Sequence, residues 1–144
     1  MASAPDTIQQ AAAIPIRDGK VCMITSSSGK RWVIPKGCRE PGKTAGEIAL
    51  QEAWEEAGLT GLLRGEPVGS YLYGKWGNVY YVTVFLMQVT EEADDWPERS
   101  LRQRLWLSPT QAITRVEEPG LREIVRGTLH SLRDLDISVG IASW

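Results

Sequence analysis

A short helix with clear signals at both ends is the sequence feature that most constrains the fold. Thr44 and Glu47 match the Thr-x-x-Glu capping box, which predicts that a helix begins near residue 45. Gly58 is the expected stop, because glycine readily adopts the left-handed conformation at a helix C-terminus. The segments on both sides of this helix have a different pattern, which is typical of strands.

These flanking runs are rich in β-branched and aromatic residues. The expected strands cover residues 11–16, 21–26, 31–34, 67–73, 79–89 and 102–107. Asp18-Gly19 and the GKWGN segment mark hairpin turns between neighbouring runs. Two further helices are expected, one after the SPTQ capping pattern at 108–111 and one over 121–132, where apolar residues recur at helical spacing. The order predicts a mixed α/β fold in one domain over residues 1–144, with tails at 1–10 and 134–144.

Length and charge exclude several classes of function. A chain of 144 residues suits one domain, and its net charge of -2 gives no reason to expect bulk nucleic-acid binding. No apolar run approaches the roughly 20 residues that span a bilayer, so no membrane partner is expected. Cys22 and Cys38 show no metal-ligand spacing, and the N-terminus lacks a signal-peptide pattern, so we expect a cytoplasmic protein. The oligomeric state stays open.

Three glutamates crowd one side of the predicted helix. Glu52, Glu55 and Glu56 stand at i,i+3 and i,i+4 spacing, where like charges each destabilise a helix by a few tenths of a kcal/mol. No Lys or Arg lies between Thr44 and Gly58, and the last turn is the negative end of the helix dipole. A solvated polar face is the simpler interpretation. A bound dication would reverse the sign of both effects, the repulsion between carboxylates and the unfavourable helix dipole, because carboxylate oxygens are hard ligands suited to Mg²⁺ or Mn²⁺. We therefore favour a metal site over a solvated face.

The loop before this helix carries the opposite charge. Residues 35–46 contain three glycines together with Lys36, Arg39 and Lys43. Glycines let the backbone approach an anion, and a helix N-terminus favours negative charge. A basic loop followed directly by an acidic, metal-like face is much rarer than a glycine-rich loop alone.

Together these residues resemble the signature of the Nudix hydrolases, which is Gly, five residues, Glu, seven residues, Arg-Glu, an aliphatic, any residue, Glu-Glu, any residue, Gly and an aliphatic. Gly37 opens the match, and its end falls in register at Glu52, Ala53, Glu55, Glu56, Gly58 and Leu59. WVIPKG before the signature and RLWLSPTQA after it are also similar to the family, so the resemblance covers roughly residues 10–132. The chain looks closest to bacterial relatives of the diphosphoinositol and dinucleoside polyphosphate hydrolases.

Two residues depart from the signature. Lys43 stands where the family has its first Glu, and Gln51 stands where it has Arg. The two positions are about 80° apart on a helical wheel. If the Glu and the Arg of the family interact with each other, the two departures are consistent with one joint exchange. Because Gln51 brings no charge to the neighbouring Glu52, the exchange leaves two interpretations open: an enzyme, or a Nudix-like sensor of nucleotides or polyphosphates without turnover. An acidic interaction protein without a small ligand is a third.

The resemblance implies an α/β/α sandwich with a mixed central sheet. It also implies metal-dependent hydrolysis of the diphosphate linkage in a nucleoside diphosphate derivative or related polyphosphate. Carried over by position, Glu52, Glu55 and Glu56 are catalytic and bind Mg²⁺ or Mn²⁺, with Glu52 as general base and the Gly37 carbonyl as a further ligand. Lys36, Arg39 and Lys43 would contact the substrate phosphates. Dinucleoside polyphosphates, diphosphoinositol polyphosphates, ADP-ribose and capped RNA ends remain candidate substrates.

Several residues outside the signature are further candidates. Trp76 is expected to contact the substrate, by stacking a base or by lining the substrate cleft, and Tyr71, Tyr73 and Tyr80 either do the same or belong to the core. A further metal-binding glutamate would come from a later loop, where the candidates are Glu91, Glu92, Glu117 and Glu118. The histidine of the last predicted helix, His130, is expected to be structural or exposed.

Overall fold

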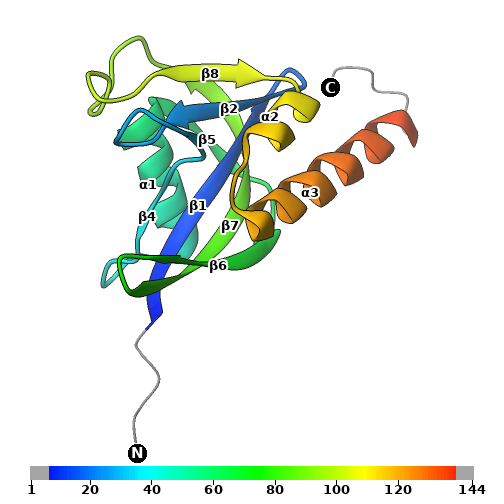
Figure 1. The fold of residues 1–144 in the computed structure, drawn as a ribbon. Coiled ribbons are helices and arrows are strands. Elements are labelled where there is room, and N and C mark those ends of the chain that lie inside the picture. Colours follow the sequence, from blue (N-terminus) through cyan, green and yellow to red (C-terminus); the bar gives the residue numbers. More distant parts are fainter. Residues whose placement is uncertain (1–6, 139–144) are drawn as a thin grey trace, which may run out of the picture.

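The computed structural model describes residues 7–138, and its side chains up to residue 132. Its elements follow in the order β1 (Thr7–Arg17), β2 (Lys20–Thr25), β3 (Trp32–Val33), β4 (Lys36–Cys38), α1 (Ala45–Ala57), β5 (Leu59–Leu63), β6 (Gly69–Lys75), β7 (Asn78–Glu92), β8 (Arg104–Leu107), α2 (Pro109–Arg115) and α3 (Pro119–Ser138). Figure 1 shows β1 and β7 running side by side through the middle of the molecule.

The strands form one mixed sheet. Its main path runs β3-β2-β1-β7-β5, while β4 pairs with β1, β6 with β7, and β8 with β2. The long central pair β1–β7 is parallel, and the other pairs are antiparallel. The predicted mixed sheet is therefore confirmed, with the parallel pair at its centre.

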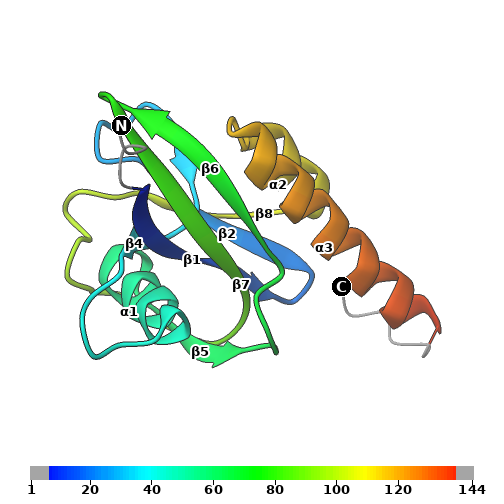
Figure 2. The same ribbon diagram turned by 90° about the horizontal axis from the view of Figure 1, so that it is seen from below.

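Each face of the sheet carries its own core. In β1, Ala12, Ile14 and Ile16 face one side, and Ala11 and Ala13 face the other, as the two-residue period of a strand requires. The first side packs against α2 and α3, and the second packs against α1. Figure 2 shows α1 on one side of the sheet and α2 and α3 on the other. The predicted α/β/α sandwich is confirmed.

The largest differences from the predicted strands concern β1, β4 and β5. The first strand begins at Thr7, so the prediction of a tail through residue 10 is wrong for residues 7–10, which pair with residues 79–82 of β7. The short strand β4 lies inside the segment predicted as loop, and β5 was not predicted. In each case hydrogen bonding to a neighbouring strand, rather than local propensity, stabilises the strand. The second predicted tail begins inside α3; residues 139–144 lie outside the described part of the chain.

Two hairpins use the same turn with different residues. Between β1 and β2, Asp18 and Gly19 have φ angles of 51° and 75°; between β6 and β7, Trp76 and Gly77 have φ angles of 52° and 78°. Positive φ at both central residues is the type I′ pattern, for which Asp-Gly and Asn-Gly are favoured. A left-handed conformation costs an ordinary L-residue roughly 1–2 kcal/mol, so tryptophan is an unfavourable choice at this position.

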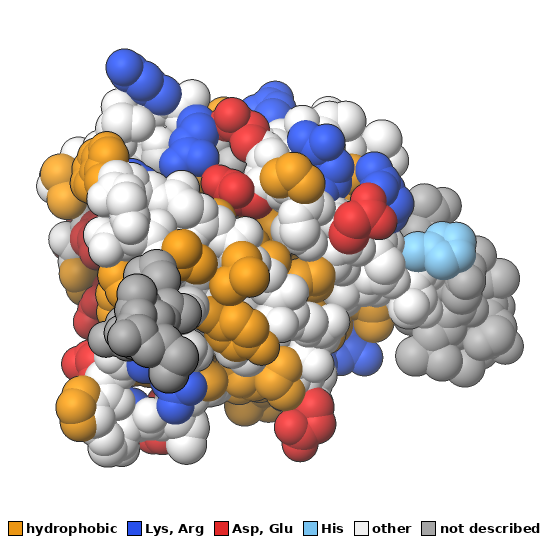
Figure 3. Space-filling model, turned by 60° about the horizontal axis from the view of Figure 1, so that its bottom comes forward, with side chains coloured by type: hydrophobic (Ala, Val, Ile, Leu, Met, Phe, Trp, Pro, Cys, Tyr) orange, Lys and Arg blue, Asp and Glu red, His pale blue; other side chains and the backbone are white. Residues whose placement is uncertain are grey.

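One face of the molecule carries side chains of both charges. On the face turned forward in Figure 3, Lys and Arg side chains lie interspersed with Asp and Glu, next to a patch of hydrophobic side chains. Within residues 7–138, none of the helices has the length and apolar character needed to cross a bilayer.

Candidate active site

Helix α1 begins and ends where its local sequence dictates. The Thr44 hydroxyl accepts a hydrogen bond from the Glu47 backbone N–H at 3.1 Å, and the Glu47 carboxylate accepts one from the Thr44 N–H at 2.9 Å. These bonds hold the pKa of Glu47 below its usual range. At the other end, Gly58 has a φ of 68° and donates to the carbonyls of the preceding turn. From this helix, the Glu52 side chain lies against β4, and the Glu56 side chain contacts both β4 and the segment before β8.

The carboxylate of Glu52 fits against the α-carbon of Gly37. Gly37 pairs with Ala11 of β1, and this pairing brings β4 alongside α1. A Cβ atom on residue 37 would lie 2.3 Å from Glu52 Oε1, so a side chain there would displace the carboxylate. Burial, followed by the charges of Glu56 and Glu55, raises the pKa of Glu52 to about 8. Glycine at this position therefore makes room for the candidate general base.

Glu56 is buried and held from two directions. Its Oε1 accepts a hydrogen bond from the Lys36 backbone N–H at 3.0 Å, and its Oε2 accepts one from Arg102 Nη2 at 2.9 Å. Burial raises the pKa of Glu56 to about 7, although the Arg102 guanidinium acts in the opposite direction. No Lys or Arg of α1 itself offsets this charge, as the sequence shows, but a cation from a distant segment pairs with Glu56.

Arg102 was expected to begin the strand at 102–107, with no role at the site, and it lies just before β8. Its guanidinium also donates to the Thr25 carbonyl at 2.8 Å and to Glu98 Oε1 at 3.1 Å, so the side chain is fixed on three sides. Nearby, the Glu98 backbone N–H donates to the Glu55 carbonyl and Trp96 Nε1 donates to the Glu56 carbonyl, both at 3.0 Å. The segment closes the negative end of α1.

The two departures from the Nudix signature contact each other. The Lys43 ammonium donates to the Gln51 side-chain carbonyl, and the Gln51 amide donates to Glu40 Oε2 at 2.8 Å. Gln51 also hydrogen-bonds to Glu52, which lowers the pKa of that carboxyl against the stronger effect of burial. The exchange of a Glu and an Arg for Lys43 and Gln51 therefore keeps a polar link between the loop and the helix.

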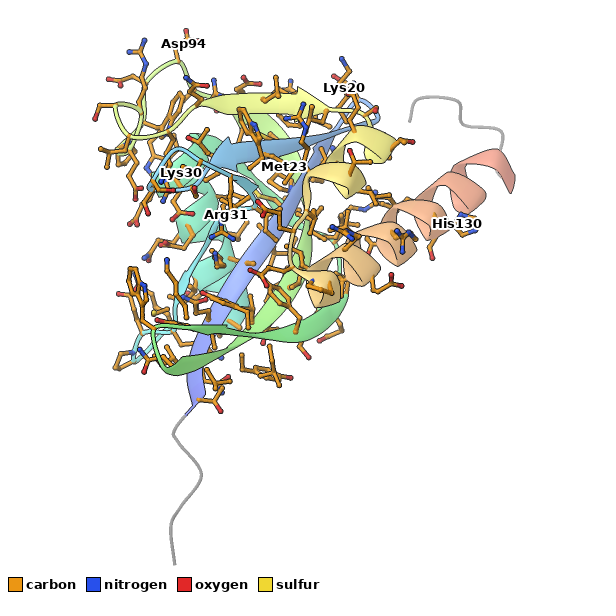
Figure 4. All side chains as sticks on the ribbon, in the orientation of Figure 1. Lys20, Met23, Lys30, Arg31, Asp94 and His130 are labelled. Carbon is orange, nitrogen blue, oxygen red and sulfur yellow. The ribbon has the colours of Figure 1, made fainter. Side chains whose placement is uncertain are left out.

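A small basic pocket lies on the other side of β4. Its volume is about 50 Å³, and Arg31, Lys36 and Lys75 are its cationic lining residues. Lys36 Nζ lies 5.4 Å from the centre of the Tyr73 ring, and burial lowers the pKa of this lysine. Arg31, which Figure 4 places between β2 and β6, is 3.6 Å from the carboxylate of Glu118. Lys36 joins the two halves of the site, because its backbone holds Glu56 while its side chain lines the pocket.

The other predicted contacts, Arg39, Lys43 and Trp76, are not among the residues that line this pocket. Arg39 is exposed, and Lys43 is engaged with Gln51. Trp76 is 87% exposed at the tip of the β6–β7 hairpin, with Lys75 Nζ 4.5 Å from the centre of its ring. Among the predicted basic contacts, Lys36 is the one that lies in the pocket.

The tyrosine rings pack mainly on one another. Tyr73 stacks on Tyr80 at 4.7 Å and lies 6.1 Å from Tyr71, and its hydroxyl donates to Gln10 at 2.8 Å. Burial raises the pKa of Tyr73 to about 12. Their packing favours the structural interpretation of these rings over base stacking.

The later glutamates and the histidine occupy different places. Glu118 lines the basic pocket and Glu117 the neighbouring one, whereas Glu92 binds Arg104 and Trp106 and Glu91 is exposed. Figure 4 shows His130 on α3, and the side chain is exposed as expected.

The donor set at α1 suits a hard dication. Glu52, Glu55 and Glu56 supply carboxylate oxygens within one another's electrostatic reach, and Glu52 packs against Gly37 of β4. Within the described residues, no three His, Cys, Asp or Glu side chains already surround a common point. Two of these carboxyls have raised pKa values, which is the response of buried acids without enough positive charge nearby. The residues present therefore fit Mg²⁺ or Mn²⁺ by their chemistry.

Comparison with known proteins agrees with this arrangement. The family model described as the NUDIX domain matches residues 7–127. Nudix hydrolase 12, mitochondrial, from Arabidopsis thaliana is 36% identical over 102 residues, which cover 65% of this chain and 50% of that protein. Diphosphoinositol polyphosphate phosphohydrolase 3-beta from Bos taurus is 32% identical over 100 residues, covering 67% of this chain and 60% of that protein. The chain spans about half the length of the first curated relatives it matches.

Solved structures share the fold. The C. elegans Ap4A hydrolase matches with a TM-score of 0.73 and 19% identity, covering 88% of this chain and 99% of that one. A NUDIX hydrolase from Nitrosomonas europaea matches with a TM-score of 0.73 and 20% identity, covering 88% of this chain and 90% of that one. At this level of identity the likeness concerns the arrangement of the sheet and helices.

Proposed function

Because this chain belongs to the Nudix family, we propose that it is a metal-dependent hydrolase that cleaves a diphosphate linkage in a nucleoside diphosphate derivative or related polyphosphate. The observation that carries the proposal is the position of β4 between two opposite charges. On one side, Gly37 and the Lys36 backbone contact the Glu52 and Glu56 carboxylates; on the other, the Lys36 side chain lines a basic pocket. A phosphate chain crossing β4 would meet both the anion-binding and the metal-binding halves.

In the proposed reaction a water oxygen attacks one phosphorus, and the bridging P–O bond breaks so that the bridging oxygen leaves with the electron pair. Glu52, the candidate general base, accepts the proton of the attacking water. Glu52, Glu55, Glu56 and the Gly37 carbonyl would hold Mg²⁺ or Mn²⁺. When bound, the dication neutralises charge on the diphosphate oxygens. Arg102 and the Lys36 N–H orient Glu56 by hydrogen-bonding to its two oxygens.

The basic pocket binds the phosphate groups that do not react. Arg31, Lys36 and Lys75 supply its positive charge, and Glu118 offsets a part of it at Arg31. The names of two similar proteins, a diphosphoinositol polyphosphate phosphohydrolase and an Ap4A hydrolase, support substrates with several linked phosphates. The roles of Arg39 and Lys43 as phosphate contacts remain predictions.

A thermal-stability series followed by a turnover assay tests the proposal. With 10 mM Mg²⁺ and a dissociation constant of about 1 mM, binding to the folded state adds about 1.4 kcal/mol to its stability. Release of phosphate or nucleotide from a panel of diphosphate compounds then separates a hydrolase from a sensor. Glu52→Gln should lower kcat by about 10²–10⁴-fold, since general-base catalysis contributes that much.

Glu66→Gln is the matched control, because it removes one exposed carboxylate from a loop after β5. It should leave both the metal-dependent shift and kcat unchanged. Absence of any shift with Mg²⁺ or Mn²⁺, together with absence of product from the whole panel, would refute the proposed activity. A shift without product would leave the sensor interpretation.

A further inference from the structure

A carboxylate stands in the wall of the basic pocket, where a bound phosphate would be repelled by it. Glu118 lines this pocket together with the three cations, and its Oε1 lies 3.6 Å from Arg31 Nη1. Both side chains of this pair are more than a third exposed, so the pair contributes little to stability. The dipole of α3, which begins at Pro119, favours a carboxylate in this place, but Glu117 beside it already supplies one. Stability alone therefore does not account for Glu118.

The loop that carries Glu118 is held firmly against the pocket. The Arg122 guanidinium donates to the Val116 carbonyl at 3.0 Å and 2.6 Å, and the Arg122 backbone N–H donates to the Glu118 carbonyl at 2.9 Å. A Cβ atom on Gly120 would lie 2.7 Å from Tyr71 Cβ, so glycine lets the first turn of α3 approach β6 closely. Figure 1 shows the start of α3 beside β6. The carboxylate is therefore a fixed feature of this wall.

The charge of Glu118 reaches into the pocket. Burial raises the pKa values of Tyr71 and Tyr73, which both line the pocket, and nearby charges that include Glu118 raise them further. An anion bound among the three cations would lie within the same reach, and like charges at such short range repel each other. Glu118 thus opposes the binding that its neighbours favour.

The size of the pocket determines which phosphates meet Glu118. Its volume of about 50 Å³ is well below the roughly 300–1,000 Å³ of pockets that enclose whole ligands, so a phosphoryl group fits inside and the next phosphates lie at the rim. In a linear chain the next phosphates follow one line, and they can cross β4 toward Gly37. Around a ring, neighbouring phosphates flank the first one on two sides, so one of them would be directed to the α3 side of the pocket.

From these observations we infer that Glu118 is a specificity-determining residue, which favours substrates whose phosphates form a linear chain over substrates whose phosphates are clustered on a ring. The inference rests on the proposed function, since it takes the basic pocket as the site of the substrate phosphates. A repulsive element of this kind discriminates by weakening the wrong ligand more than the right one. Among the candidate substrates, it favours those with phosphates joined end to end over diphosphoinositol polyphosphates.

Calorimetry without a dication tests the inference, because neither ligand is then turned over. The ligands carry three phosphates each: inorganic tripolyphosphate, and an inositol trisphosphate with its phosphates on adjacent carbons. Glu118→Gln should tighten binding of the inositol trisphosphate about tenfold and that of tripolyphosphate by less than about threefold, since only the clustered phosphates lose a close like charge. Glu118→Asp keeps the charge, so the ratio of the two affinities should stay near that of the wild type.

Glu123→Gln is the matched control, because it removes an equal charge from an exposed position of the same helix, outside the basic pocket. It should leave both affinities unchanged. Arg31→Gln should weaken both ligands, since it removes a cation of the pocket.

Equal gains for the two ligands in Glu118→Gln would overturn the inference, by showing that Glu118 only masks Arg31. The same gains in Glu123→Gln would also overturn it, because the effect would then come from the general surface charge. Unchanged binding in Arg31→Gln would remove the pocket as a phosphate site, while metal-dependent turnover could persist. Failure of the proposed function would look different, because no diphosphate compound would be hydrolysed while the effect of Glu118→Gln on the two affinities remained.

Discussion

The Glu56 carboxylate accepts a hydrogen bond from the Arg102 guanidinium at 2.9 Å across 46 positions of sequence, and both side chains are only 11% exposed. A buried ion pair contributes modestly to stability while it is intact, but removing one partner leaves an uncompensated charge in the interior. Arg102 thus determines whether Glu56 can stay buried at the end of α1. Several measurable consequences follow from this pair and from the contacts around it.

Arg102→Ala should lower the free energy of unfolding by about 3 kcal/mol, because Glu56 would lose its buried partner. Adding Glu56→Gln should recover part of that loss, since the double variant buries no unpaired charge; denaturant titration of the four variants measures the coupling. Arg99→Ala is the control, because its ion pair with Asp95 is exposed and should contribute less than about 1 kcal/mol. If the double variant lost as much free energy of unfolding as the two single variants together, the prediction would be contradicted.

Gly37→Ala should impair catalysis more than stability. The new methyl group would displace the Glu52 carboxylate, whose end can move, so the Tm should change little while kcat/KM with Mg²⁺ falls at least tenfold. Gly127→Ala on α3 provides the comparison, because nothing lies within 4 Å of its Cβ position. There the substitution should stabilise the helix by about 0.5–1 kcal/mol and leave kcat/KM unchanged. Wild-type activity in Gly37→Ala would show that the contact with Glu52 has no catalytic role.

Lys43 and Gln51 should behave as a pair. Lys43→Glu alone would place a new negative charge close to Glu40 and Glu52, and Gln51→Arg alone would set a second cation against Lys43. The double variant restores the charges of the family signature, so its Tm and kcat should exceed those expected from the two single variants. The expected coupling is about 0.5–1 kcal/mol in the free energy of unfolding. A coupling of zero would show that the contact does not link the two positions.

The two cysteines should react at very different rates. Cys22 is buried, and burial raises the pKa of its thiol to about 12, so at pH 8 it is a neutral, covered thiol. Cys38 is exposed at the end of β4. Thiol titration of the folded protein at pH 8 should therefore label one cysteine rapidly, with the second reacting only as fast as the chain opens. Cys38→Ser should abolish the rapid phase; rapid labelling of Cys22 in that variant would show that its side of the core is accessible.

Features that depend on neighbours in sequence were determined by the sequence itself. The capping box of Thr44 and Glu47 and the stop at Gly58 set the bounds of α1, because each involves hydrogen bonds between residues three to five positions apart. The β-branched and aromatic residues at 79–89 likewise predicted a strand, and helical spacing predicted which glutamates share one side of the helix. All of these features follow from the types and spacing of residues that are close together in the sequence.

Only the tertiary structure decided how those pieces meet. The chain contains 16 Lys and Arg residues, and no local pattern shows that Arg102 is the one that pairs with Glu56. Strand β4 forms because β1 pairs with it, and the contact between Gly37 and Glu52 exists because that pairing places β4 against α1. Contacts of this kind are fixed by closing long loops around a shared core, so their geometry depends on the whole chain rather than on any one segment.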